Sequence, residues 1–314
     1  MPDIRSNAEN GEQPAAPGLL RQLQGDLMAL TKARLSILVV LTACFGYWVA
    51  TKGSGAFSWG VFLHIFFGTT LAASGAAVFN QLMEIESDAK MQRTSDRPLP
   101  SNRMPRALAF VLGWLLAAFG LVHLGVKVNA AASMMAGATL LVYLFVYTPM
   151  KRVSPANTLV GAVSGALPPL IGWAGGNQPL LGAGAFFLFG LLFFWQLPHF
   201  AAINWMYREE YIRGGFRMWS NDDESGAKTA RIALAYSVCL TLLAVGFPLF
   251  SGIMSAWGAL PGGVLAGIMA ALSAKFLGSG ERRDARRLFF YTLLYLPLAM
   301  VASYLAWVPD AALN

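Results

Sequence analysis

The sequence predicts an all-α protein, a polytopic membrane bundle of about nine transmembrane helices around a central cavity. Composition is the first indication, because the 314 residues are 56% hydrophobic and only 12% charged, with a mean hydropathy of +0.53. A soluble domain usually carries about 25% charged residues. Apolar runs also recur from about residue 35 to the end, without a polar block large enough to fold separately. We therefore expect a polar cytoplasmic tail over residues 1–30 and one membrane domain over residues 31–314.

The N-terminal tail divides into two parts. Residues 1–17 are rich in Asn, Glu, Gln, Pro and Ala, a composition typical of disordered segments. Spaced leucines follow, and they predict either an amphipathic helix at the membrane surface or the first turns of a longer first helix: Leu19, Leu20, Leu23, Leu27 and Leu30. We recognise neither a signal peptide nor an Arg- and Ser-rich leader, which favours a bacterial plasma membrane as the location.

Apolar runs of about 20 residues, the length that crosses a bilayer as a helix, define the expected spans. They fall at roughly 35–51, 58–82, 107–125, 129–147, 157–175, 180–203, 231–250, 254–275 and 288–308. An odd number of spans places the termini on opposite sides. All Lys and Arg residues except Lys52 and Lys127 would then lie on the side of the N-terminus. Positive charge gathers on the cytoplasmic side of membrane proteins, so we expect a cytoplasmic N-terminus.

Other features of the composition exclude some functions. The net charge of +7 does not indicate nucleic-acid binding, because the basic residues are spread over short loops instead of one polar face. Cys44 and Cys239 each lie inside an apolar run, so we expect buried small side chains and not a disulfide or a metal pair. His64 and His123 have no accompanying motif, and we interpret them as ordinary structural residues.

The second span ends in a polar segment that carries the strongest chemical signal. Asn80, Glu84 and Asp88 recur every four residues, so on a helix they share one face, before Pro98 and Pro100 prevent the helix from continuing. Oxygen ligands of this kind suit Mg²⁺, whose coordination shell is commonly completed by substrate phosphates. The pattern predicts a site for a divalent cation and a diphosphate. The alternative is that these side chains only solvate the end of a helix.

Basic residues near this segment favour the diphosphate interpretation. Lys90, Arg93 and Arg97 follow the acidic residues directly, and Lys151 with Arg152 forms a basic turn after the fourth span. Arginine can hold phosphate oxygens by bidentate hydrogen bonds and lysine acts as a point charge. The topology alone would also place positive charge here, so the argument depends on these residues sharing a loop with the carboxylates.

The fifth span contains features that suggest a cavity. Gly161, Gly165 and Gly172 are spaced to permit close helix contact, and the pair Pro168-Pro169 should break the helix inside the membrane. Irregular backbone at that depth is tolerated where it is buried in protein or lines a cavity. Close packing without a substrate role is the alternative.

The sixth span leads into a second polar segment. Pro198 should kink this helix and turn His199 towards the cavity, although a lone histidine is more often a hydrogen-bonded structural residue. Tyr207, Glu210 and Tyr211 follow on the same side of the membrane. We expect the first polar segment (residues 84–106) and the second polar segment (residues 204–229) to roof a single cavity.

Together these residues resemble a known family, the protoheme IX farnesyltransferases (heme O synthases) of the intramembrane aromatic prenyltransferase superfamily. The matching segments are Asn80-x-x-x-Glu84-x-x-x-Asp88-x-x-Met91-x-Arg93-Thr94-x-x-Arg97-Pro98-Leu99, Tyr147-Thr148-x-x-Lys151-Arg152, Gly165-Ala166-x-Pro168-Pro169-x-x-Gly172-Trp173 and Trp195-Gln196-x-Pro198-His199-Phe200. The chain departs from the family pattern at Glu84, where Asp is common. It also lacks both prolines of the family's second acidic loop, since Gly215 to Ser220 contains none.

The resemblance implies a farnesyltransferase that depends on magnesium. It would transfer the farnesyl group of farnesyl diphosphate to a vinyl group of protoheme IX (heme B), with addition of water, giving heme O and diphosphate. The implied metal ligands are Asn80, Glu84, Asp88 and Glu210. The implied catalytic residues are Asn80, Glu84, Asp88, Arg93 and Arg97. Substrate contacts would come from Lys90, Lys151, Arg152, His199, Tyr207, Glu210 and Tyr211.

Farnesyl diphosphate, heme B and the lipid bilayer are therefore the expected partners, with no nucleic acid. A heme A synthase or a terminal oxidase is a candidate assembly partner. One alternative is a related membrane prenyltransferase whose acceptor is a hydroxybenzoate, a naphthoquinol precursor or a chlorophyllide. A more remote alternative is a secondary transporter, which would place its functional charges near the midplane of the membrane.

Overall fold

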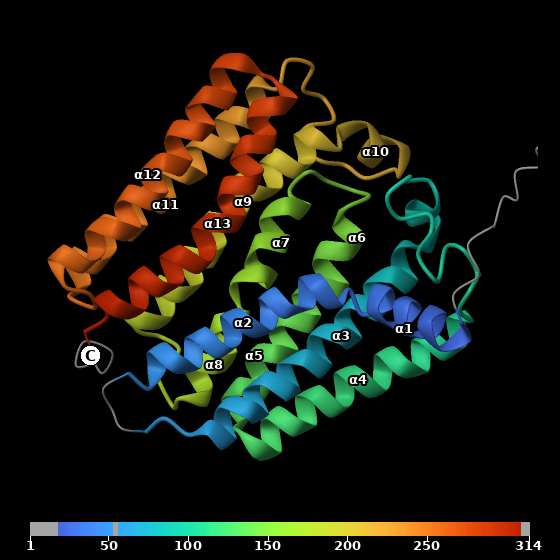
Figure 1. Cartoon of the computed structure of the whole chain (residues 1–314), viewed down its shortest axis with the longest axis horizontal. Coiled ribbons are helices and arrows are strands. Elements are labelled where there is room, and N and C mark those ends of the chain that lie inside the picture. Colours follow the sequence, from blue (N-terminus) through green and yellow to red (C-terminus); the bar gives the residue numbers. More distant parts are fainter. Residues whose placement is uncertain (1–17, 53–55, 309–314) are drawn as a thin grey trace, which may run out of the picture.

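The computed structural model describes residues 18–52 and 56–308 (Figure 1). The predicted disorder of residues 1–17 lies outside the described residues. The helices are α1 (Leu19–Leu30), α2 (Ala33–Ala50), α3 (Trp59–Ala89), α4 (Arg106–Lys127), α5 (Ala130–Leu141), the π-helix η1 (Val142–Tyr147), α6 (Thr148–Met150), α7 (Asn157–Ala166), α8 (Pro168–Gly175), α9 (Ala183–Met206), α10 (Arg208–Arg213), α11 (Ala227–Ser251), α12 (Ala256–Ser279) and α13 (Arg282–Ala306).

The all-α, multi-pass architecture is confirmed. Within the described ranges, nine helical spans are long and apolar enough to cross a membrane. The fourth span, Ala130–Met150, combines α5, η1 and α6, and the fifth, Asn157–Gly175, combines α7 and α8. The break expected at the proline pair is present, because α7 ends at Ala166 and α8 begins at Pro168. Cys44 is buried and Cys239 is partly buried, and both are free thiols, as the sequence indicates.

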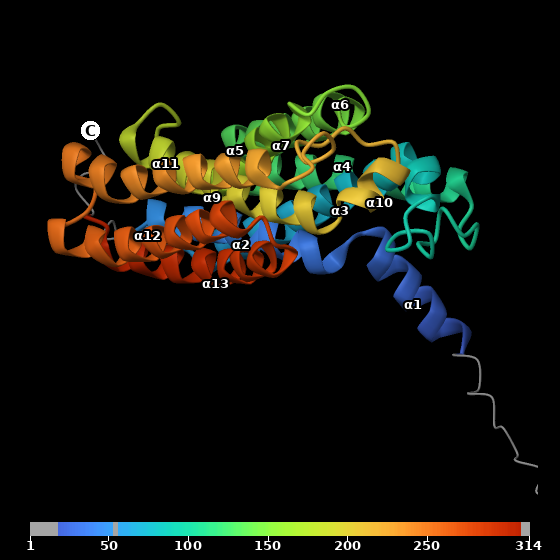
Figure 2. The same cartoon turned by 90° about the horizontal axis from the view of Figure 1, so that it is seen from above.

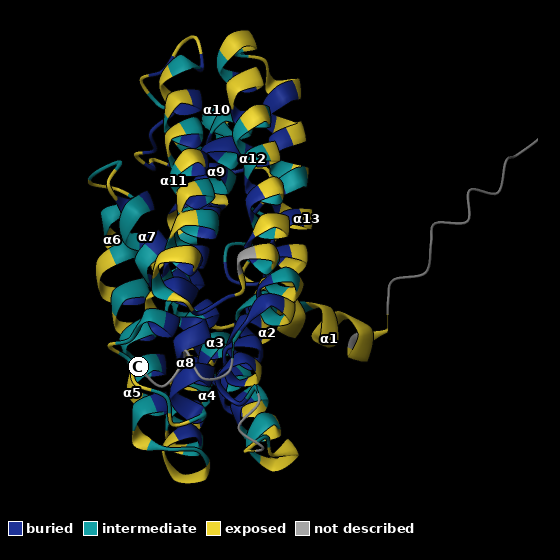
Figure 3. Cartoon of the chain, turned by 90° about the vertical axis from the view of Figure 1, so that its left-hand side faces the viewer, coloured by how far each residue is buried: buried dark blue, intermediate teal, exposed yellow. Residues whose placement is uncertain are grey.

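The spans are arranged with α8 and α9 in the interior. Helix α9 packs against α7, α11 and α13, and helix α8 packs against α2. Helix α3 lies between α2 and α4. The fifth and sixth spans are the most buried, with 72% and 61% of their most apolar windows inside the protein. Figure 3 shows many exposed residues along α11 and α12, and large apolar side chains such as Trp114, Leu242 and Val264 are exposed on the outer helices. This distribution suits a bundle whose outer face contacts lipid.

Within the described residues, helix α1 is attached to the bundle only near its C-terminal end. It projects outward in Figure 2 and ends before Lys32, whose φ of 47° interrupts the helix ahead of α2. Leu30 at its end is fully buried, and the side-chain amide of Gln81 donates to the Leu30 carbonyl at 2.8 Å. The leucines nearer its start are exposed: Leu20, Leu23 and Leu27. An apolar surface of this kind on a projecting helix is suited to the membrane interface.

At the end of the bundle away from the polar segments, Lys52 caps α13. Its ammonium donates to the main-chain carbonyls of Tyr304, of Leu305 at 3.2 Å and of Trp307 at 2.9 Å. These are carbonyls that the end of a helix leaves without intrahelical partners. The cation also lies 4.9 Å from the centre of the Tyr304 ring.

We expect Lys52→Met to lower the thermal stability of the detergent-solubilised protein. A cation at a partly buried helix C-terminus contributes up to about 2 kcal/mol, and its removal also leaves carbonyls without a donor. Thermal unfolding followed by tryptophan fluorescence would measure the change. Lys127→Met, at the exposed end of α4, is the matched control and should have a smaller effect. Equal melting temperatures for the two variants would contradict this role of Lys52.

Candidate functional site

A cavity of about 460 Å³ lies inside the bundle. Helices α2, α3, α5, η1, α7, α8 and α9 and the two polar segments supply its walls, and within the described part of the chain no lining residue comes from α4, α11, α12 or α13. Small side chains of α3, such as Ala72 and Ala76, line its apolar part. Its other end is strongly polar. The cavity therefore combines an apolar compartment with a charged one.

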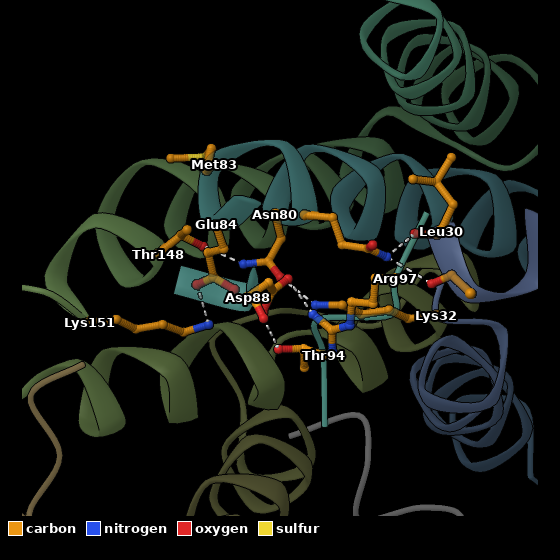
Figure 4. Close-up of polar contacts among 12 residues, drawn as sticks. Leu30, Lys32, Asn80, Met83, Glu84, Asp88, Thr94, Arg97, Thr148 and Lys151 are labelled. Atoms are coloured by element: carbon orange, nitrogen blue, oxygen red, sulfur yellow. Dashed lines mark hydrogen bonds and ion pairs between the residues drawn. The ribbon is translucent and has the colours of Figure 1, made fainter. Parts of the chain in front are cut away.

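The charged end is formed by the last turns of α3. This helix continues to Ala89, so Asn80, Glu84 and Asp88 lie on one helical face, as their spacing predicts (Figure 4). All three are buried, with exposed fractions of 0%, 4% and 1% respectively. Glu84 and Asp88 line the cavity, whereas Asn80 is not among the lining residues.

Both carboxylates are paired with cations. The ammonium of Lys151 lies 2.8 Å from Oε1 of Glu84, and Nη1 of Arg97 lies 2.6 Å from Oδ2 of Asp88. Burial disfavours the charge of Lys151, but the Glu84 carboxylate outweighs this effect and raises the pKa of Lys151 above its usual value. The cavity therefore holds fixed positive charge beside its acidic groups.

Asn80 is held by Lys32, whose positive charge in the sequence indicates only the membrane topology. The Lys32 ammonium donates to Oδ1 of Asn80, whose amide nitrogen donates to the Thr148 hydroxyl at 3.2 Å. Burial lowers the pKa of Lys32 from 10.5 to about 7, although the charge of Glu84 opposes this shift. Lys32 also lines the cavity. No local motif marks it, because its role depends on a contact 48 positions along the chain.

The two polar segments meet above the cavity, as expected. The guanidinium of Arg93 lies 4.9 Å from the ring centre of Tyr207 and 5.7 Å from that of Tyr211. The main-chain N–H of Arg93 donates to Oε2 of Glu210 at 3.4 Å. Arg93 and Tyr211 line the cavity, while Tyr207 and Glu210 are not among the lining residues. In this structure Tyr207 and Glu210 therefore contact Arg93 and do not line the cavity.

Main-chain contacts attach the second polar segment to the basic turn. The N–H of Arg217 donates to the Lys151 carbonyl at 2.6 Å, and the side-chain amide of Asn157 donates to the Arg217 carbonyl at 2.7 Å. The Lys151 ammonium also lies 4.5 Å from the centre of the Tyr147 ring. These contacts fix Lys151 over the cavity.

Two of the predicted basic residues lie outside the cavity lining. Lys90 and Arg152 are exposed, and Arg152 donates to the main-chain carbonyl of Met83 at 3.2 Å. Their contact with substrate stays a prediction, as does metal binding by Glu210.

The donor set fits a magnesium ion. Among the described residues, no three His, Cys, Asp or Glu side chains form a group that could hold a metal by themselves. Mg²⁺ does not require one, since it often binds one or two carboxylates together with substrate phosphates and waters. Glu84 and Asp88 are two such carboxylates facing one cavity, whereas the amide oxygen of Asn80, one turn away, accepts from Lys32 in this structure.

His199 lines the cavity, as the position after Pro198 predicts. Its Nδ1 lies 2.7 Å from the hydroxyl of Thr292 in α13. The rings of Trp195 and Phe289 lie nearly parallel to the imidazole, with interplanar angles of 21° and 26°. Sequence reasoning missed Thr292, because α13 carries no motif that would single it out.

The π-helix η1 is another feature that the sequence did not reveal. It carries Tyr143 and Tyr147, whose ring centres are 5.5 Å apart, and both line the cavity. π-helical turns occur frequently at functional sites. The hydrophobic pattern of this span is compatible with an ordinary α-helix, so only the structure identifies the wider turn.

Comparison with known proteins identifies relatives over most of the chain. A model of the UbiA prenyltransferase family matches residues 39–295. The mitochondrial protoheme IX farnesyltransferase of Arabidopsis thaliana is 39% identical over 272 residues, covering 86% of this chain and 62% of that protein. The protoheme IX farnesyltransferase of Opitutus terrae is 39% identical over 278 residues, covering 88% and 92%. The chain thus spans about three fifths of the plant protein and nearly all of the bacterial one.

Solved structures show the same fold at low sequence identity. A structure of digeranylgeranylglyceryl phosphate synthase has a TM-score of 0.74 and 16% identity, covering 91% of this chain and 98% of that chain. A UbiA homolog from Archaeoglobus fulgidus bound to GPP and Mg²⁺ has a TM-score of 0.61 and 12% identity, covering 88% and 99%.

Proposed function

Because the chain belongs to the UbiA prenyltransferase family, we propose that it transfers a farnesyl group from farnesyl diphosphate to a vinyl group of protoheme IX. Addition of water would complete the reaction and give heme O and diphosphate. Relatives named protoheme IX farnesyltransferase, at 35% to 39% identity over most of the chain, support this acceptor. The observation that carries the proposal is one cavity with paired carboxylates and cations at one end and an apolar, histidine-bearing space beside them.

The diphosphate belongs at the charged end. Glu84 and Asp88, with Asn80 beside them, would hold Mg²⁺, which supplies positive charge where negative charge grows on the leaving diphosphate. Arg97 and Lys151 already line this end of the cavity. They can share their hydrogen bonds between the carboxylates and the phosphate oxygens.

Further basic groups would complete the diphosphate site. Arg93 is held by two tyrosines at the cavity, and we propose that it contacts phosphate. Lys90 and Arg152 would contribute positive charge at the protein surface, where it attracts the diphosphate as the substrate enters. Glu210 of the second polar segment would bind the metal. Lys32 is an addition to this set, since it lies at the cavity and contacts Asn80.

The apolar part of the cavity suits the farnesyl chain and the porphyrin. As the allylic C–O bond breaks, the bonding electrons leave with the diphosphate, and the electron pair of a heme vinyl group attacks the allylic carbon. Water then adds to the resulting cation and loses a proton, which leaves a hydroxyl group. Walls made of alanine, leucine and aromatic side chains would limit earlier capture of the allylic cation by water.

A membrane location follows from the nine apolar spans within the described residues, and the orientation of the protein in the membrane is part of the proposal. The basic residues of both polar segments support a cytoplasmic location for this end of the bundle. In that orientation α1 would lie along the cytoplasmic interface as part of a tail over residues 1–30, ahead of a prenyltransferase domain over residues 31–314. A bacterial plasma membrane would be the host membrane.

The transporter alternative is less consistent with the site. Glu84 and Asp88 occupy the last turns of a 31-residue helix and not its middle. A transporter is expected to gather such charges near the midplane.

Purified protein in lipid vesicles should convert heme B to heme O when farnesyl diphosphate and Mg²⁺ are present. Liquid chromatography with mass spectrometry would detect the product by its added farnesyl group and water. Parallel reactions with a hydroxybenzoate, a naphthoquinol precursor or a chlorophyllide test the alternative acceptors. Absence of heme O, while a related farnesyltransferase is active under the same conditions, would reject the assignment. Preferential farnesylation of another acceptor would identify the alternative enzyme.

A further inference from the structure

Thr292 determines which ring nitrogen of His199 carries the proton. The Thr292 hydroxyl has a single hydrogen. Its oxygen lies 2.6 Å from the carbonyl oxygen of Phe289, which can only accept. The hydroxyl must therefore donate to that carbonyl. Its 2.7 Å contact with Nδ1 of His199 then requires Nδ1–H to be the donor. In the neutral imidazole, the other nitrogen, Nε2, consequently carries a free lone pair.

The imidazole is also fixed in orientation. The centres of the Trp195 and Phe289 rings lie 5.5 Å and 5.0 Å from its own centre, on nearly parallel planes. The indole N–H of Trp195 donates to the main-chain carbonyl of Thr292 at 2.7 Å. Because Thr292 thus binds both the histidine and its stacking partner, α9 and α13 together hold the ring.

His199 is placed differently from the other two histidines. It lines the cavity, and within the described residues its Nε2 has no protein partner. His64 and His123 do not line the cavity, and they contact each other at 3.2 Å between the start of α3 and the end of α4. A metal-containing ligand in the cavity would meet only one imidazole from these three residues.

We propose that Thr292 is a positioning residue that presents Nε2 of His199 to the cavity as an axial ligand for the iron of the heme substrate. This inference rests on the proposed function, which supplies a heme as the acceptor. Histidines that bind metals usually donate their second ring N–H to a hydrogen-bond acceptor, which fixes the tautomer and the ring orientation. Here the acceptor is the Thr292 hydroxyl. One coordinate bond forms from the Nε2 lone pair to iron, with no change in the oxidation state of the metal.

Iron ligation would give the acceptor site its geometry. A porphyrin held through its iron lies across the Fe–N bond, so the position of His199 limits where the vinyl groups can lie relative to the allylic carbon. The bond would thereby contribute to orientation, which is an important part of catalysis when two substrates must meet.

Heme binding without farnesyl diphosphate or Mg²⁺ tests this proposal. Heme B would be titrated into the purified protein, with absorption spectra for affinity and resonance Raman spectra for the iron–histidine stretch of the ferrous form. The wild type and Thr292→Ser, which keeps the hydroxyl, should show histidine ligation. His199→Ala should lose that signature, and added imidazole should restore it. Thr292→Val should weaken heme binding by about 10- to 100-fold. The control His64→Ala should match the wild type.

Two results would overturn the proposal. The first is a His199→Ala protein that keeps the wild-type iron–histidine signature. The second is a Thr292→Val protein with unchanged affinity and signature, which would remove the role of the hydroxyl. The hydrogen bond from the Trp195 indole uses the main chain of Thr292 and should survive this substitution. Thermal unfolding would verify that the variant is folded. If Thr292→Val does not fold, Thr292→Ala replaces it in the same comparison with Thr292→Ser.

The heme O assay is independent of these spectra. If the wild type makes heme O and His199→Ala keeps the iron–histidine signature, iron ligation by His199 is rejected. The proposed function then stays intact. A wild type that makes no heme O would reject the function, whatever ligand the spectra reveal.

Discussion

Replacing Asp88 with asparagine should lower the rate of heme O formation by at least about 10²-fold, the scale on which electrostatic stabilisation of a transition state acts. Asparagine has nearly the same size, so the substitution removes charge with little change in volume. Asp88 is 1% exposed and accepts from Arg97 at 2.6 Å. Its loss would weaken magnesium binding and leave the Arg97 cation without its partner. Product formation measured over a range of Mg²⁺ concentrations would show the effect.

Asp96→Asn is the matched control for this prediction. The Asp96 side chain is 94% exposed and pairs with Arg103 away from the cavity lining. Its replacement should leave turnover close to that of the wild type. Chelation of divalent cations should reduce the wild-type rate in the same way as Asp88→Asn. A near-normal rate for Asp88→Asn, in a protein that inserts and melts normally, would contradict the role of Asp88 in the diphosphate site.

Replacing Gly172 with alanine should strongly destabilise the bundle. A Cβ at this position would lie 1.8 Å from the carbonyl oxygen of Ala43 and 2.5 Å from the main-chain nitrogen of Tyr47. On the facing helix, a Cβ at Gly46 would lie 1.9 Å from the carbonyl oxygen of Pro169. Because these neighbours are backbone atoms, α2 and α8 would have to separate. Overpacking of this kind costs about 1–3 kcal/mol and occasionally more.

Thermal unfolding in detergent would measure this effect, with Gly246→Ala as the control. Gly246 lies within α11 and has no atom within 4 Å of an added Cβ. Alanine there should be neutral or stabilising, since it favours a helix by up to about 1 kcal/mol relative to glycine. Heme O formation should also fall in Gly172→Ala, because neighbouring Ile171 lines the cavity. Similar melting temperatures for both variants would show that α2 and α8 can separate at little cost.

The sequence by itself determined the features that depend on local periodicity. Apolar runs of membrane length gave the spans, because backbone hydrogen bonds in lipid must be satisfied within each helix. The four-residue spacing of Asn80, Glu84 and Asp88 placed them on one face, since helix geometry relates such positions directly. The Pro168-Pro169 pair marked a helix break for an equally local reason, because proline lacks the N–H that continues the hydrogen-bond ladder.

Only the tertiary structure decided which distant side chains meet. Lys32 reaches Asn80, Arg93 lies over Tyr207, and Thr292 contacts His199. Each contact depends on how whole helices pack, and that packing is set by shape complementarity along their full length. The sequence therefore indicated a metal and diphosphate site from one helical face. The packing of α9 against α13 brought the Thr292 hydroxyl to 2.7 Å from Nδ1 of His199.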